Sequence, residues 1–358
     1  MKQHVRLYEQ WLNEGGWATT KTQNTQIKPK IIADCVSKMG IIGKEFKAHC
    51  ESAAVSLPQL EFGQPVGSGT WYEDDIESQP DKVYGDVDFL LVYPTLDLDK
   101  GNERANEIET SKVYNAQLMD FLKNKNYSFI DYEESQKISN PTSLKLVMEV
   151  KTTEGTGWIQ VDLIVTHSGY KDWTYFRLTP IRNVKGFVLG NLYSSFGEAL
   201  ELSIMTRGVR AKFSGTQMVS YSKRAGTEER LITADVVNFM KDIVMFFIEN
   251  SEKQSIDFDM TELNSWKMNA NNPSFEELCN GIKIGANTLE KLGEFGTVVK
   301  YKSAKELLDT VKSIYIQKMQ TAASSSKFDK AETPAAKAAA DKVKNLVNEY
   351  IEKANKLL

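Results

Sequence analysis

The chain has 358 residues, of which 41% are hydrophobic and 26% charged, and its formal net charge is −4 at pH 7. The length allows two or three domains with a sizeable core, and the composition is that of an ordinary globular protein. A slightly acidic balance argues against a protein that coats nucleic acid through bulk electrostatics, although it is compatible with a local basic patch. No apolar run approaches the length of a membrane span, so we expect no membrane partner.

Cysteine and histidine usage indicates neither a disulfide framework nor a zinc site. The three cysteines, Cys35, Cys50 and Cys279, are widely spaced and odd in number, and the three histidines are scattered. This usage is typical of reduced thiols in an intracellular protein, so we expect a cytoplasmic location.

The N-terminal segment, residues 1–26, has two interpretations. Residues 1–14 carry apolar side chains at roughly helical spacing, which predicts a short amphipathic helix docked on the body of the protein. Alternatively, Leu12-Asn13-Glu14 followed by Gly15 resembles the capsid-targeting peptides that the prohead protease of T-even-type phages cleaves. The second interpretation implies a phage origin, with the host cytoplasm or the virion as the location.

A helix and a strand are predicted to follow. Apolar residues at helical spacing predict a helix over residues 29–54, interrupted or frayed near Gly40 and Gly43. Residues 60–66 follow this helix, and we expect them to form a strand.

Two aspartates in the next apolar strand predict a metal site. A strand period of two sends Asp86 and Asp88 to one face and Val87, Phe89 and Leu91 to the other. Neighbouring carboxylates repel each other unless a cation lies between them, and Mg²⁺ is the usual ion because it takes oxygen ligands and also holds phosphates.

A glycine-rich loop precedes this strand and predicts a phosphate site. Its backbone N–H groups can approach a ligand closely, and two hydroxyl side chains accompany them, as a triphosphate tail requires. The residues of this loop are Gly67, Ser68, Gly69 and Thr70. Loop and carboxylates together predict a nucleotide–metal site.

Two further strands are expected to complete the sheet. Alternation over residues 144–151 sends Lys145 and Lys151 to the side of the carboxylates, where either can contact a phosphate or can instead form an ordinary solvated cross-strand charge. Residues 158–165 alternate in the same way, and Asp162 faces away from their apolar side. Between the strand that carries Asp86 and Asp88 and these two strands, a helix is predicted over residues 100–125.

In this order, Gly-Ser, Asp-x-Asp and a later aspartate in an apolar strand resemble the polymerase-β-like nucleotidyltransferase superfamily. The resemblance covers residues 27–180 and implies a mixed-sheet catalytic domain. It also implies that Asp86, Asp88 and Asp162 hold two Mg²⁺ ions and are catalytic, while Ser68 and its loop bind the β- and γ-phosphates of an NTP. One departure is the long acidic loop expected between Thr70 and Asp86, where the family often has a short helix with basic or small residues.

The activity implied is transfer of a nucleoside monophosphate from an NTP, such as ATP, to an acceptor hydroxyl, with release of pyrophosphate. An RNA 3′ end (of tRNA, for example) or a nucleotide is the acceptor that we favour, while a small molecule or a protein hydroxyl is also used on this fold. The alternative function is that of a non-catalytic nucleotide-binding protein or a structural protein inside a virion.

After residue 179 the pattern predicts a helical domain over residues 181–320, then a linker and a C-terminal helix over 321–358. Helices are expected around residues 189–204, 236–247, 275–292, 304–319 and from Pro334 onward, the last with a stripe that packs on its own domain. A basic segment between the first two helices is predicted to be a loop, and it either contacts the triphosphate or forms a solvated face. Its cations are Arg207, Arg210, Lys212, Lys223, Arg224 and Arg230. The predicted fold class is therefore α+β, with a mixed-sheet nucleotidyltransferase core followed by a mainly helical C-terminal region.

Overall fold

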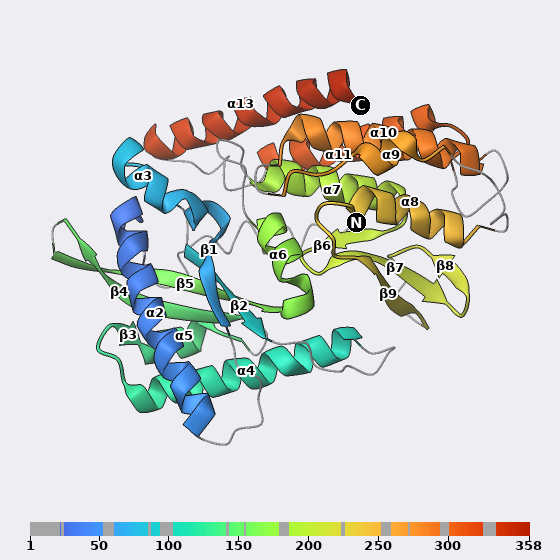
Figure 1. Cartoon of the computed structure of the whole chain (residues 1–358). Helices are drawn as coiled ribbons and strands as arrows, with labels where there is room; N and C mark the ends of the chain where they lie inside the picture. Colours follow the sequence, from blue (N-terminus) through green and yellow to red (C-terminus); the bar gives the residue numbers. More distant parts are fainter. Residues whose placement is uncertain are drawn as a thin grey trace. The chain divides into compact units, whose positions relative to one another are not determined.

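The structure is a computed structural model and describes residues 22, 25–52, 61–84, 87–93, 103–140, 143–153, 155–178, 186–222, 226–251, 259–270, 273–293, 301–324 and 334–358. It has the predicted fold class, a mixed sheet with helices followed by a C-terminal helical region (Figure 1). The chain divides into two compact units: the first contains Met1–Lys171 and Leu178–Pro180, and the second contains Asp172–Arg177 and Ile181–Leu358. Residues 1–14 and most of the expected linker over 321–332 lie outside the described residues.

A five-stranded mixed sheet with the order β1-β2-β5-β4-β3 forms the centre of the first unit. Its strands are β1 (Glu61–Val66), β2 (Val87–Tyr93), β3 (Ile130–Asp131), β4 (Leu144–Thr152) and β5 (Gly155–His167). β2 and β5 run parallel, whereas β1 with β2, β4 with β5 and β3 with β4 are antiparallel. The strands predicted over residues 60–66, 144–151 and 158–165 are therefore confirmed.

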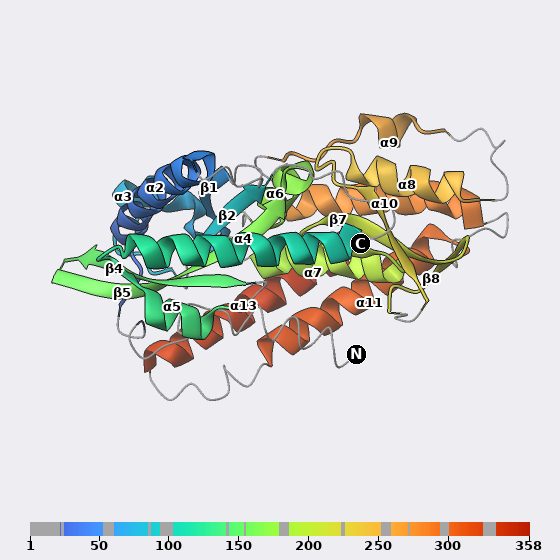
Figure 2. The ribbon, with the colours of Figure 1, turned by 90° about the horizontal axis from the view of Figure 1, so that it is seen from below.

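Two long helices cover one face of this sheet, α2 (Pro29–Ser52) and α4 (Glu103–Lys125) (Figures 1 and 2). Phe46 of α2 and Phe121 of α4 belong to the same buried cluster as Phe89 of β2 and Val161 of β5. Because side chains alternate along a strand, residues at the intervening positions of β2 and β5 face the other side of the sheet. The remaining elements here are η1 (Gly67–Trp71), α3 (Tyr72–Ser78), α5 (Tyr132–Ile138), η2 (Ser168–Tyr170) and α6 (Lys171–Leu178), most of which belongs to the second unit.

α2 runs without a break through both glycines, so the predicted interruption is wrong. A Cβ on Gly43 would lie 2.8 Å from Phe62 Cγ of β1, whereas nothing lies within 4 Å of a Cβ on Gly40. Gly43 thus permits close packing of the helix against the strand, which offsets the low helix propensity of glycine.

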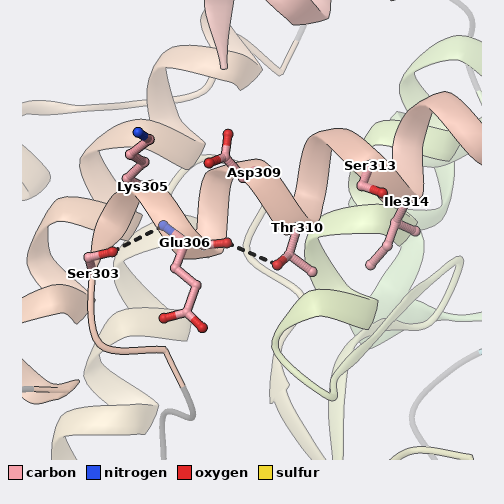
Figure 3. Close-up of a pocket in the computed structure, with 7 residues that line it drawn as sticks. All are labelled: Ser303, Lys305, Glu306, Asp309, Thr310, Ser313 and Ile314. Carbon is pink, nitrogen blue, oxygen red and sulfur yellow. Dashed lines mark hydrogen bonds between the residues drawn. The ribbon is translucent and has the colours of Figure 1, made fainter.

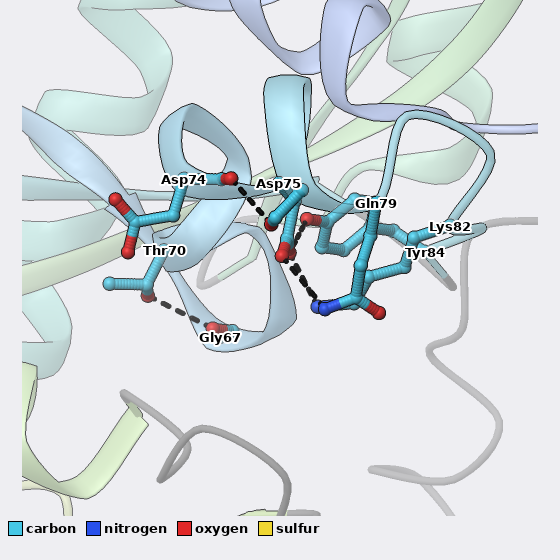
Figure 4. Close-up of polar contacts among 8 residues, drawn as sticks. Gly67, Thr70, Asp74, Asp75, Gln79, Lys82 and Tyr84 are labelled. Carbon is cyan, nitrogen blue, oxygen red and sulfur yellow. Dashed lines mark hydrogen bonds and ion pairs between the residues drawn. The ribbon is translucent and has the colours of Figure 1, made fainter.

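The acidic stretch after Thr70 is also not a loop: it forms the last turn of η1 and the helix α3. Glu73, Asp74 and Asp75 lie in the first turn of α3, where the helix dipole favours negative charge. The side chain of Asp75 is fully buried and accepts hydrogen bonds from Lys82 Nζ at 2.5 Å, Tyr84 OH at 2.5 Å and Gln79 Nε2 at 3.3 Å (Figure 4). A short helix therefore occupies this place, although its side chains are acidic rather than the basic or small ones expected from the resemblance.

The second unit contains a four-stranded antiparallel sheet where the sequence predicted a basic loop. β7 (Gly208–Ser214) pairs with β6 (Ser203–Met205), β8 (Gln217–Val219) and β9 (Glu228–Thr233). Val209, Ala211 and Phe213 of β7 are buried, so the alternation typical of a strand is present among the basic residues. The expected helix over 189–204 ends at Ala199, and Ile204 belongs to β6.

Helices make up the rest of the second unit: α7 (Gly186–Ala199), α8 (Phe239–Glu249), α9 (Thr261–Ser265), α10 (Phe275–Gly293), α11 (Ala304–Ala323) and α13 (Pro334–Leu357). α13 packs on α10 and α11 through a stripe that includes Val347 and Tyr350, and the Tyr350 ring lies edge-on to Phe275 at 5.0 Å. Among the described residues, none of the helices is both long and apolar enough to cross a membrane.

The two glycines of α2 should respond in opposite directions to alanine. Gly40→Ala should stabilise the protein by roughly 0.5–1 kcal/mol, because alanine loses less backbone entropy in a helix. Gly43→Ala should instead destabilise it by about 1–3 kcal/mol, because the added methyl group meets the Phe62 ring. Urea unfolding followed by circular dichroism measures both changes, and equal effects at the two positions would contradict the packing described.

Candidate functional site

Asp88 and Asp162 lie side by side in the sheet of the first unit. They are register partners on the parallel strands β2 and β5, whose backbones are about 4.8 Å apart. Their neighbours Val87 and Val161, also register partners, are fully buried on the side of α2 and α4. Both carboxylates therefore project from the opposite face, and the expected match between the two strands is confirmed.

Asp162 is held by two neighbours on the same face. Gln160 Nε2 donates a hydrogen bond to its Oδ1 at 2.6 Å, and Lys145 Nζ of β4 lies 3.3 Å from its Oδ2. Asp162 is only 9% exposed, and burial raises the pKa of its carboxyl, although Lys145 and Gln160 act to lower it. Lys145, expected to reach a phosphate, is thus the counter-charge of Asp162 in this structure.

The predicted glycine-rich loop forms the 3-10 helix η1, and its first residue, Gly67, lies against Asp88. Val66, the residue before it, is the register partner of Asp88. Gly67 has a φ of +66°, and a Cβ added to it would lie 2.6 Å from Asp88 Oδ2. Glycine is thus required both by the left-handed backbone and by the close approach to the carboxylate. Thr70 Oγ1 donates a hydrogen bond to Gly67 O at 2.9 Å, which closes the turn (Figure 4).

Some predicted site residues are not described or lie elsewhere. Asp86 and the side chain of Ser68 lie outside the described residues, and no group of three His, Cys, Asp or Glu side chains that could hold a metal occurs within them. Lys151 is six residues beyond Lys145 on β4, about 20 Å along the strand, and it is exposed. The structure therefore does not bring Lys151 to the carboxylates.

Arg210, Lys212 and Arg230 of the basic segment have partners within the second unit, whereas Lys223 and Arg224 lie outside the described residues. Arg210 is 2% exposed, its Nε donates to Arg207 O at 3.1 Å, and its Nη1 lies 3.5 Å from Glu229 Oε1. Tyr221 OH donates to Glu229 Oε2 at 2.6 Å, and Lys212 Nζ lies 4.5 Å from the centre of the Tyr221 ring. Arg210 thus ties β7 to β9 and is not the surface cation that the sequence suggested.

Two contributions to the first unit were not anticipated. Gln160 lies two residues before Asp162, so the strand period already placed its amide on the face of the carboxylates. The buried network of Asp75 had no comparable sequence signal, since Lys82 and Tyr84 follow a short helix that was not predicted.

A hollow of about 500 Å³ lies along α11, and two of the hydroxyl side chains that line it form hydrogen bonds within the helix (Figure 3). Ser303 Oγ accepts a hydrogen bond from the backbone N–H of Glu306 at 3.2 Å, as an N-cap residue does, and Thr310 Oγ1 donates to Glu306 O at 2.9 Å. A second hollow of about 450 Å³ adjoins it, towards Asn355 of α13. Neither contains a residue of the predicted site.

Comparison with known proteins identifies no family for this chain. No protein-family model matches it, and no curated protein matches it. Two crystal structures of polymerase beta from Leishmania infantum are structurally similar at a TM-score of 0.31. The ternary P/T complex has 13% identity over 52% of this chain and 58% of that chain, less than two thirds of its length. The ternary gap complex has 11% identity, and the match covers 80% of this chain and 68% of that chain. A likeness this low carries no argument, so function is inferred from the residues.

The raised pKa of Asp162 predicts a pH effect on stability. Because the folded protein binds this proton more tightly than the unfolded chain, ionisation of Asp162 costs stability as the pH rises from about 3.8 through the folded pKa. Asp162→Asn should therefore gain stability relative to the wild type between pH 3 and pH 7. Each tenfold increase in proton affinity on folding corresponds to a gain of about 1.4 kcal/mol.

An NMR titration of the Asp162 carboxyl carbon measures the same pKa directly. Lys145→Met should raise it further, because the cation 3.3 Å away is removed. An Asp162 pKa at or below 3.8 in the wild type would contradict the environment described here.

Proposed function

We propose that the first unit is a Mg²⁺-dependent nucleotidyltransferase, which moves a nucleoside monophosphate from an NTP to an acceptor hydroxyl and releases pyrophosphate. The observation that carries this proposal is one row of register partners across four neighbouring strands. The row consists of Val66, Asp88, Asp162 and Lys145, on β1, β2, β5 and β4. This row brings two carboxylates and a cation together on one face of the sheet, next to Gly67.

The residues present fit a magnesium ion. Carboxylate oxygens are the ligands that Mg²⁺ prefers, and Asp88 and Asp162 present theirs from adjacent positions. Burial raises the pKa of Asp162, and the charge of Lys145 opposes this rise only in part. A bound metal ion would favour the ionised carboxylate more strongly than one lysine does. The strand period predicts that Asp86, which lies outside the described residues, joins them, and we propose two Mg²⁺ ions held by the three aspartates.

When bound, two Mg²⁺ ions would stabilise the attacking and leaving oxygens of an in-line displacement. The chain itself contributes orientation and proton transfer. Backbone N–H groups of residues 67–70 would bind the β- and γ-phosphates, held in place by the bond from Thr70 to Gly67. Asp162 would accept the proton of the acceptor hydroxyl, since burial shifts its pKa upward from that of an ordinary aspartate.

The acceptor that we propose is a nucleotide or an RNA 3′ end. A net charge of −4 disfavours binding along a long RNA track, and the pairing of Arg210 with Glu229 removes one of the cations that could contact it. Incubation with each labelled NTP and Mg²⁺ against tRNA, nucleotide and protein acceptors identifies the substrates. The same experiment tests the alternative of a non-catalytic nucleotide-binding protein, which would bind an NTP without releasing pyrophosphate.

Asp88→Asn and Asp162→Asn should each lower Mg²⁺-dependent pyrophosphate release by roughly 100-fold or more, equivalent to about 3 kcal/mol of transition-state stabilisation. Each change removes a negative metal ligand while preserving the shape of the side chain. Asp81→Asn is the matched control, because Asp81 is largely exposed and is paired with Lys28. Activity near that of the wild type in both site variants would rule out the catalytic assignment.

Gly67→Ala should impair nucleotide turnover by displacing the carboxylate of Asp88, which its methyl group would meet at 2.6 Å. Gly215→Ala controls for backbone strain, because Gly215 has a similar φ of +64° and nothing lies within 4 Å of an added Cβ. We expect comparable losses of stability, about 1 kcal/mol, in both variants but at least a roughly tenfold loss of kcat/KM in Gly67→Ala only. Equal kcat/KM values would show that the loop does not position Asp88.

A further inference from the structure

Arg177, in the last turn of α6, is a buried cation of the second unit. Its guanidinium stacks on the ring of Tyr193 in α7, with 4.6 Å between Cζ and the ring centre. Phe176 and Phe239 lie edge-on to the same ring at 5.6 and 5.7 Å, so the surroundings are aromatic. Arg177 Nε and the Tyr193 hydroxyl are both buried, and neither has a hydrogen-bond partner in the described part of the chain.

Arg177 also lacks a counter-charge among the described residues. Burial lowers the pKa of its guanidinium to about 10, and within the described part of the chain Tyr193 alone acts against this effect. Two other arginines of the same unit are paired with acids: Arg210 with Glu229 and Arg230 with Glu228. A buried cation without an acid is costly, and a bound anion is a common way to supply the missing charge.

Space remains beside one edge of the guanidinium. The residue as a whole is only partly buried although Nε is sealed. A Cβ added to Gly190 of α7 would have Arg177 Nη2, at 4.0 Å, as its nearest neighbour, so the space between Gly190 and this edge of the guanidinium is open. The planar fork of an arginine binds two oxygens of one oxyanion, and a tyrosine hydroxyl can donate to a third.

We propose that Arg177 and Tyr193 form a binding site for a phosphate-class oxyanion, either free pyrophosphate or the phosphates of a nucleotide. The site lies within the second unit and needs no metal ion. It therefore does not depend on the nucleotidyl transfer proposed for the first unit, and either proposal can fail without the other.

Thermal unfolding in EDTA with pyrophosphate as the probe tests the site, with sodium chloride at equal ionic strength as the reference. EDTA removes metal-dependent binding at the carboxylates. Pyrophosphate should raise the unfolding midpoint of the wild type by a few degrees, and Arg177→Met should abolish the shift. Tyr193→Phe should weaken binding severalfold. Arg230→Met is the control that should retain the full shift, because Arg230 also stacks on a ring, that of Phe213 at 4.3 Å, but is paired with Glu228.

Without the anion, Arg177→Met should unfold at a higher midpoint than the wild type, since it removes an uncompensated buried charge. If Arg177 had only a structural role, Arg177→Met would instead unfold at a lower midpoint than the wild type. ATP, ADP and adenosine, each in EDTA, distinguish the two sources: a nucleotide site prefers ATP over pyrophosphate, whereas a pyrophosphate site does not.

The wild type alone provides a second measurement if Arg177→Met does not fold. The ¹⁵N resonance of Arg177 Nε, assigned by its absence from the spectrum of Arg177→Lys, should move on addition of pyrophosphate while that of Arg230 does not. No shift in the midpoint and no movement of this resonance, or a midpoint shift that survives in Arg177→Met, would overturn the proposal.

Discussion

The parallel pairing of β2 with β5 is the constraint on which the candidate site depends. Residues 87, 89 and 91 of β2 are buried opposite residues 161, 163 and 165 of β5 on the side of α2 and α4. A slip of one residue in either strand would turn Asp88 or Asp162 into that apolar core, where an unpaired carboxylate costs several kcal/mol. Packing of the core therefore fixes the two carboxylates next to each other before any ligand arrives.

Four buried or partly buried charges among the described residues are compensated to different degrees, and our functional proposals are based on that difference. Asp75 receives three hydrogen bonds, one of them from Lys82, and Arg210 is paired with Glu229 inside a sheet. Asp162 is only partly compensated, because its pKa remains raised beside Lys145. Arg177 has no acid partner among the described residues. The incompletely compensated groups are those for which we propose ligands, a divalent cation and an oxyanion.

Strands with one apolar face were predictable, because the period of two also identifies the side of the sheet to which Asp88 and Asp162 belong. Tertiary contacts decided the features that were missed. Gly40 and Gly43 suggested a helix break, but packing against Phe62 keeps α2 continuous. Acidic residues after Thr70 suggested a loop, although they favour a helix N-terminus. Basic residues hid the apolar alternation of β7, and no local pattern indicates that Arg210 pairs with Glu229.

The central claim, that Asp88 and Asp162 share a divalent metal site, is tested most directly with Mn²⁺ as a replacement for Mg²⁺. Crystals of the protein grown with Mn²⁺ and a non-hydrolysable NTP analogue permit anomalous diffraction, which locates the ion. The account predicts an anomalous peak within about 2.5 Å of a carboxylate oxygen of each aspartate. A Mn²⁺ ion bound elsewhere, with Lys145 still paired to Asp162, would contradict it.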